Sequence, residues 1–131
     1  MDFSGSKSEI SGVTIDRVGD KGISAGEKSK VSGMGINILN TEIGITSKDL
    51  SDVELTGVQI KDTRLGIAVF QKKPEYGPAK IKITELDMEN IDLNYLVGPN
   101  SSAVLNGKAV TRKESQVEDL LYGVEYGKSS K

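Results

Sequence analysis

Six residues spread along the chain carry side chains suited to contacting a sugar: two acids, two lysines and two aromatic residues. They are Glu27, Lys48, Asp49, Phe70, Lys72 and Tyr76. Apolar surface with a few placed polar groups is typical of small-ligand sites. An aromatic ring can cover the apolar face of a sugar, and charged groups can bond its hydroxyls or uronate. We therefore expect these residues to border a shallow groove for an acidic or neutral glycan. The structural alternative is that the aromatic rings hold a loop in place and the charges are solvated.

The same charged residues leave catalytic interpretations open. On neighbouring strands, the carboxyls of Glu27 and Asp49 would lie about 5 Å apart, which suits shared calcium or a retaining hydrolase. Calcium takes 6–8 oxygen ligands, so two acids are few. Lys48 could act as the base in β-elimination, but nearby acids predict a raised pKa that makes it a poor one. We assign no catalytic residue and no metal ligand, and calcium is the only candidate cofactor.

The spacing of apolar residues indicates the elements that position these side chains. Glycine–isoleucine pairs begin at Gly22, Gly44 and Gly66, so the pair recurs every 22 residues. Within a unit, apolar residues such as Val58 and Ile60 alternate with polar ones, the pattern of short strands with one buried face. A repeat in the low twenties with branched apolar residues in phase is typical of a solenoid. We predict an all-β fold, a right-handed parallel β-helix of about four coils.

The repeat is less regular beyond its central units. A shift of 28 carries Val53 to Ile81, and the six additional residues fit an inserted loop at 72–78, which holds two prolines and one glycine. Toward the N-terminus, Ile10 matches Val31 at a shift of 21. We interpret this shorter spacing as the loss of one residue between two strands of the first unit.

One polar column follows the same repeat. Asn40 maps onto Asp62 at a shift of 22, and Asp62 maps onto Asn90 at a shift of 28. Asn and Asp tolerate left-handed backbone geometry and bond nearby backbone groups. We expect a structural ladder at a corner between two strands. A sugar or metal contact is the functional alternative.

The two ends of the chain differ. We expect coils over 1–100 and a C-terminal cap over 101–131. The Asn-Gly pair at 106–107 predicts a hairpin with a type I′ turn, and a capping box at 115–118 opens a short helix that ends near Tyr122. At the N-terminus no helix pattern closes the first coil, and an open coil exposes a strand edge. We expect the chain to begin within a longer β-helix and to self-associate through that edge.

Composition narrows the function classes. The 131 residues suit one domain, and the net charge of −2 gives no electrostatic case for nucleic acid or an anionic membrane. Cysteine and histidine are both absent, which excludes disulfides, zinc–thiolate sites, histidine-based triads and histidine-ligated metals. No apolar run has membrane-spanning length and no signal-peptide pattern is present. The sequence indicates no compartment.

The units that begin at Gly19, Gly44 and Gly66 resemble the repeats of bacterial right-handed parallel β-helix proteins, the pectate-lyase-like superfamily. More narrowly, the chain is similar to the C-terminal segment of larger bacterial β-helix repeat proteins. The resemblance covers residues 10–97 and implies a surface that handles extended polysaccharide. It supplies no catalytic motif that can be placed on this sequence.

Three classes of function follow. We expect a non-catalytic polysaccharide-binding or structural segment of a larger bacterial protein. The alternatives are a fragment of a polysaccharide lyase or hydrolase, and an oligomerising stalk or tailspike-like element.

Overall fold

The computed structural model describes residues 1–17 and 20–110. Segments of alternating apolar and polar residues form the strands within these ranges. The fold is all-β, a parallel β-solenoid of about five turns with a repeat of about 22 residues. The described strands are β1 (Asp2–Ser4), β2 (Lys7–Asp16), β3 (Lys21–Gly26), β4 (Lys30–Leu39), β5 (Ile43–Lys48), β6 (Asp52–Phe70), β7 (Lys80–Val97), β8 (Ser102–Leu105) and β9 (Lys108–Val110). These residues include no helix, so none that is long and apolar enough to cross a membrane.

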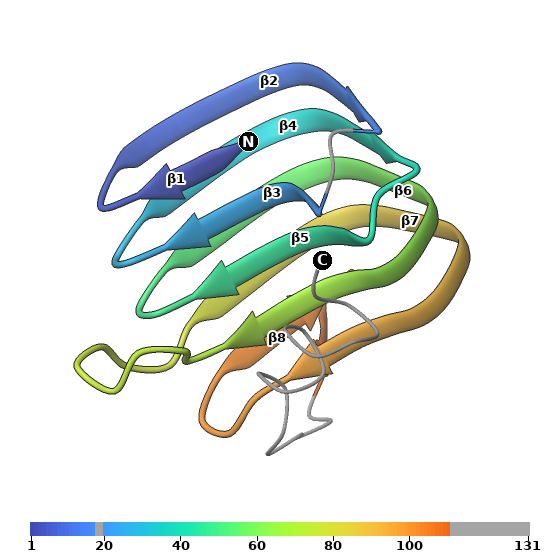
Figure 1. The fold of residues 1–131 in the computed structure, drawn as a ribbon. Coiled ribbons are helices and arrows are strands. Elements are labelled where there is room, and N and C mark those ends of the chain that lie inside the picture. Colours follow the sequence, from blue (N-terminus) through green and yellow to red (C-terminus); the bar gives the residue numbers. More distant parts are fainter. Residues whose placement is uncertain (18–19, 111–131) are drawn as a thin grey trace.

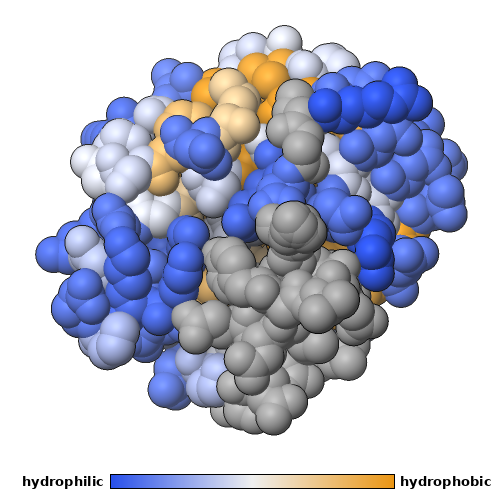
Figure 2. All heavy atoms as spheres, viewed as in Figure 1, coloured by the Kyte–Doolittle hydropathy of each residue, from blue (hydrophilic) through white to orange (hydrophobic). Residues whose placement is uncertain are grey.

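The strands stack in two parallel series, one on each side of the solenoid (Figure 1). One side runs β1, β3, β5, the second half of β6 and the second half of β7. The other runs β2, β4, the first half of β6, the first half of β7 and β8. Both β6 and β7 bend from one side to the other. No described residue pairs with the outer edges of β1 and β2, and Figure 2 shows apolar surface along this upper edge.

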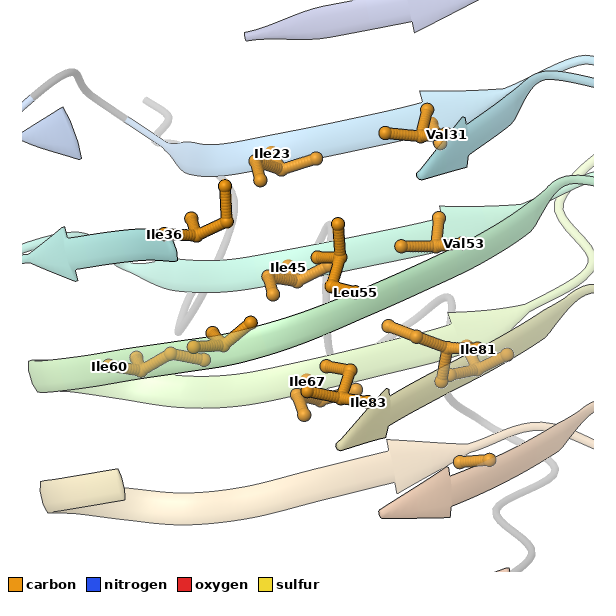
Figure 3. Packing of buried hydrophobic residues seen from close by; sticks show 14 of the residues in the cluster. Ile23, Val31, Ile36, Ile45, Val53, Leu55, Ile60, Ile67, Ile81 and Ile83 are labelled. Atoms are coloured by element: carbon orange, nitrogen blue, oxygen red, sulfur yellow. The ribbon is translucent and has the colours of Figure 1, made fainter. Parts of the chain in front are cut away.

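The interior between the two sides is filled by columns of aliphatic side chains (Figure 3). Ile23, Ile45 and Ile67 stack in one column, and Val31, Val53 and Ile81 in another. All six are 0–2% exposed. Burying a side chain of this size contributes roughly 1.5–3 kcal/mol relative to leaving it exposed. Because each turn can bury its inner face only against its neighbours, the repeats stabilise one another.

The fold has one more turn than the four we expected. At the top, β1 pairs with β3 and β2 with β4, so the first residues already form a turn. At the bottom, β8 adds in parallel below β7 before it turns back. The expectation of about four coils left out β1 and β8, because strands of three and four residues carry too few apolar positions to show the repeat.

The N-terminal register predicted from the sequence is wrong. The structure pairs Ile10 with Gly33, at a shift of 23 and not 21. A slip of two residues leaves the same side chains pointing inward, so the apolar pattern does not distinguish the two registers. The glycines at the bend of each turn distinguish the two registers, since Gly12, Gly35 and Gly57 all have φ between +61° and +71°.

Polar residues occupy the corners. Asn40, Asp62 and Asn90 all have left-handed backbones with φ of 52–57°. The Asn90 amide donates to Asp62 Oδ1 at 2.6 Å, and the Asn40 amide donates to Asp16 Oδ1 at 2.9 Å. At a second corner the Ser29 N–H donates to Ser51 Oγ at 3.1 Å. The Asn–Asp bonds link side chains of successive turns at one corner, and the Ser51 hydroxyl satisfies a backbone N–H at the other.

The predicted C-terminal hairpin is confirmed. β8 and β9 are antiparallel, and Asn106 and Gly107 have φ of 53° and 77°, as a type I′ turn requires. Asn106 also bonds both backbone groups of Leu86, accepting from its N–H at 2.8 Å and donating to its C=O at 3.1 Å. The predicted short helix from Ser115 to about Tyr122 lies outside the described residues.

Candidate functional site

A cavity of about 300 Å³ opens on the outer surface of the β1–β3–β5 side. Its lining joins these strands to the turns that follow them and to the inserted loop after β6. Four lysines and three acids lie in it. The lining residues are Asp2, Phe3, Ser4, Lys21, Ser24, Gly26, Glu27, Lys48, Asp49, Lys72 and Lys73. The cavity therefore brings together four of the six predicted site residues: Glu27, Lys48, Asp49 and Lys72.

Glu27 forms one wall of the cavity. Its carboxylate accepts a hydrogen bond of 2.7 Å from Ser4 Oγ and forms an ion pair with the Lys73 ammonium. The hydrogen bond from Lys73, then that from Ser4, holds the pKa of Glu27 below its usual value. The same bond to Glu27 raises the pKa of Lys73. Because Lys73 lies in the inserted loop, this ion pair ties the loop to the turn after β3.

Asp49 has a structural role that the sequence did not reveal. Its side chain is fully buried, and Oδ1 accepts hydrogen bonds from the backbone N–H groups of Lys72 and Lys73 at 2.7 and 2.8 Å. Asp49 also lines the cavity, and its contact with a ligand stays a prediction. The carboxylate is oriented toward the loop backbone, because that loop starts directly over it.

Lys48 projects from the end of β5 and is partly buried. We expected nearby acids to raise its pKa, and that expectation is wrong. Burial lowers the pKa of Lys48, and the positive charges of Lys72 and Lys21 lower it further. Asp49 acts in the opposite direction, with a smaller effect. The Glu27 carboxylate is paired with Lys73 and Asp49 Oδ1 with backbone amides, and burial is the largest cause of the lowered pKa of Lys48.

The two aromatic residues do not line the cavity. Phe70 is 1% exposed and packs with Ile43, Leu65, Ala68 and Leu96 in a second apolar cluster. The ring that we expected at a groove margin is buried here, and its contact with a sugar stays a prediction. Tyr76 lies half-buried in the inserted loop, where its backbone C=O accepts a hydrogen bond of 2.8 Å from Gln71 Nε2. Neither ring is placed to stack on a sugar in this cavity.

Sequence reasoning missed Lys21, Lys73 and the β1 residues of the cavity. Lys21 stands in register with Ile43, so its outward position follows from the period of two. Lys73 belongs to the insertion that interrupts the repeat, and β1 pairs with β3 in the regular shift of 22. The repeat thus predicts the positions of Lys21 and β1. It does not predict the direction in which the inserted loop folds, and so it does not place Lys73.

The described residues contain no group of three or more acidic side chains placed to hold a metal ion. Glu27 and Asp49 belong to successive turns, but the bonds described above point Oδ1 of Asp49 at the loop and Glu27 at Lys73. The arrangement does not fit a shared calcium ion. Lysine side chains from three turns line the same cavity.

Comparisons with protein-family models, curated proteins and solved structures found no match.

Proposed function

We propose that this chain is a non-catalytic polysaccharide-binding solenoid segment, and that the lysine-lined cavity binds a carboxylate or sulfate group of an anionic glycan. The observation that carries the proposal is the convergence of Lys21, Lys48 and Lys72 on one cavity. Sites for small ligands typically have volumes of about 300–1,000 Å³, so this one suits a single charged sugar unit. The remainder of an extended glycan would lie along the outer surface.

Electrostatics support an anionic ligand. Burial and the positive charges of Lys72 and Lys21 lower the pKa of Lys48, so the local potential in the cavity is positive. An anion bound there would form charge-assisted hydrogen bonds with lysine ammonium groups, which are shorter and stronger than neutral ones. A neutral glycan does not gain this advantage. The proposal therefore favours the acidic class among the glycans that the sequence left open.

A polysaccharide lyase remains the second candidate, because the lowered pKa of Lys48 favours it. A lysine that loses its proton more easily can accept the proton removed in β-elimination on a uronate. Lys21 and Lys72 would then stabilise the uronate carboxylate. We also propose, for either candidate, that the solenoid is right-handed and related to the pectate-lyase-like superfamily. The chain would then be a segment of a larger bacterial protein.

The test measures binding and product formation in the same samples. Isothermal titration with polygalacturonate, a sulfated glycan and dextran should give binding to one or both anionic polymers that weakens with salt. Lys48→Met keeps the length of the side chain and should weaken that binding at least tenfold. Lys30→Met removes an exposed lysine outside the cavity and is the matched control.

Ultraviolet absorbance of unsaturated products identifies the lyase. Product from polygalacturonate that disappears in Lys48→Met would replace the binding proposal with catalysis. Equal affinity for dextran and the anionic polymers, or an unchanged affinity in Lys48→Met, would contradict both. Single-stranded DNA included as a non-sugar polyanion separates glycan recognition from charge alone.

A further inference from the structure

The β8–β9 hairpin carries a residue pair that is prone to spontaneous chemistry. Asn106 and Gly107 form its turn, at the lower end of the solenoid (Figure 1). Of the six asparagines in the chain, only Asn106 is followed by glycine. Glycine has no side chain to keep its backbone nitrogen away from the preceding residue. Among the asparagine side chains, that of Asn106 is therefore the most open to attack by the next backbone nitrogen.

The reaction is deamidation through a cyclic imide. The backbone nitrogen of Gly107 forms a bond to Cγ of Asn106, the bond from Cγ to Nδ2 breaks, and ammonia leaves with the proton of the Gly107 nitrogen. Water then opens the ring at either of its carbonyl groups. One opening gives aspartate, and the other gives isoaspartate, in which the main chain runs through the side-chain carbons. Water is the only co-reactant that these steps need.

The turn is accessible to water. Asn106 and Gly107 are both exposed, and a Cβ placed on Gly107 would meet no atom of the described residues within 4 Å. Among the described strands, β9 has three residues and pairs only with β8. Elements with few buried contacts open locally more often than the core of a fold. We therefore expect this hairpin to open while the solenoid stays folded.

In the closed hairpin, the Asn106 side chain is engaged by β7. Its Oδ1 accepts a hydrogen bond of 2.8 Å from the Leu86 N–H, and its Nδ2 donates one of 3.1 Å to the Leu86 C=O. The backbone N–H of Asn106 donates to the Ile83 C=O at 2.8 Å. Side chain and backbone of this residue are thus both fixed to the strand above the hairpin.

We propose that Asn106 is a deamidation site that the closed hairpin holds in check. Attack brings Cγ of Asn106 onto the Gly107 nitrogen, and this movement breaks both side-chain hydrogen bonds to Leu86. Two hydrogen bonds of ordinary net strength correspond to a factor of about ten or more in rate. The reaction therefore proceeds from the open hairpin. The inference does not depend on the proposed function.

Both products weaken the hairpin. Aspartate still accepts from the Leu86 N–H, but it has no N–H to donate to the Leu86 C=O, and its carboxylate is repelled by that oxygen. Isoaspartate adds an atom to the main chain of a turn whose geometry sets the register of β8 and β9. Deamidation would therefore turn a reversible opening of the hairpin into a permanent one.

Peptide mapping of the full chain tests the site. The protein is incubated at mildly alkaline pH in native buffer and in urea, and trypsin then leaves residues 83–108 as one peptide. Mass spectrometry should find conversion at Asn106 that is about tenfold or more slower in native buffer than in urea. Asn100, which serine follows in the same peptide, is the internal reference and should convert more slowly than Asn106 in urea. No conversion at Asn106 in urea, or equal rates in the two conditions, would overturn the proposal.

A variant that loosens the hairpin tests the restraint. Leu105→Ala truncates a buried side chain next to the turn and should speed the conversion of Asn106 in native buffer. Ile15→Ala truncates a buried side chain in β2, at the other end of the solenoid, and should not. Conversion no faster in Leu105→Ala than in wild type, or equally accelerated in both variants, contradicts the proposal. If Leu105→Ala does not fold, urea below the wild-type unfolding transition replaces it, and the rate should rise before the solenoid unfolds.

Asn106→Asp reproduces one product and tests its consequence. Hydrogen exchange of the β8 and β9 backbone N–H groups should be about fivefold or more faster in Asn106→Asp than in wild type, because one hydrogen bond is lost. The N–H groups of β3, far from the hairpin, should exchange at the wild-type rate. Exchange in β8 and β9 that matches the wild type would show that deamidation to aspartate does not loosen the hairpin.

Discussion

At the scale of single residues, the cavity depends on which charges are already engaged. Glu27 is bound by Lys73 and Ser4, and Asp49 is bound by the backbone of the inserted loop. Lys48 is left under the dominant influence of burial and of two other lysines. Counting charges along the chain would pair Lys48 with the adjacent Asp49 and predict the opposite direction of the pKa shift.

This arrangement predicts a pH-dependent effect of Lys48→Met on stability. Since the folded-state pKa of Lys48 lies below the ordinary lysine value of 10.5, the unfolded chain binds this proton more tightly. The charged lysine destabilises the fold at neutral pH, and the penalty falls as pH rises through the lowered pKa toward 10.5. Lys48→Met should therefore be more stable at pH 7, by roughly 1 kcal/mol or less because the site is partly exposed.

Urea denaturation at several pH values measures this difference. The stability advantage of Lys48→Met over wild type should shrink between neutral and alkaline pH. Lys30→Met, at an exposed site, should show little difference at any pH. An advantage that stays constant or grows with pH would contradict the assigned direction.

At the scale of elements, glycines set how closely successive turns approach. At Gly44, a Cβ would come within 2.5 Å of the Gly66 carbonyl oxygen and 3.1 Å of the Ile60 side chain. At Gly26, the nearest atom would be Cε of Lys48 at 3.0 Å, the far end of a flexible side chain. Both glycines lie in strands, but only the first one faces backbone that cannot move.

We therefore predict opposite tolerance to the same substitution at these two sites. Gly44→Ala should destabilise the fold by about 3 kcal/mol or more, because overpacking forces the ladder apart. Gly26→Ala should cost less than about 1 kcal/mol, since the Lys48 side chain can rotate away. Thermal and urea unfolding of both variants provide the measurement. Equal losses would show that close approach is not the reason for glycine in the Gly-Ile pair.

At the scale of the whole molecule, the outer edge of β2 has no strand partner among the described residues. β2 has ten residues and pairs only with β4 among the described elements. An edge of this length is a template for pairing with another chain. Figure 2 shows apolar surface along the same edge, where a second molecule would make contact. Self-association through the first turn therefore stays a prediction.

A charge on the edge should suppress this association. Ser11 is exposed on β2 and stands in register with Met34 and then with Thr56 on an inner strand. Ser11→Lys should lower the weight-average mass at high protein concentration, whereas Thr56→Lys, in the same column but away from the edge, should not. Sedimentation over a range of concentrations measures the effect. A monomer at all concentrations in the wild type would contradict the prediction.

Most of the fold was predictable from the sequence, and much less of the site was. The central registers, such as Ile45 with Ile67 and Val53 with Ile81, were correct because inward positions must repeat in phase to fill one core. The N-terminal register was wrong because a slip of two residues preserves the inward face. For Phe70, the period of two predicted an outward position but not that this position is covered.

Period and turn chemistry are local properties, so the sequence by itself determined the parallel solenoid, its inserted loop and its C-terminal hairpin. Only the tertiary structure decided which charges meet. Lys73 contacts Glu27, 46 positions earlier in the chain, and Lys21 and Lys72 come together around Lys48. These contacts depend on how a loop folds back over the stacked turns. The repeat does not encode the direction in which the loop folds, and that direction sets the electrostatics of the cavity.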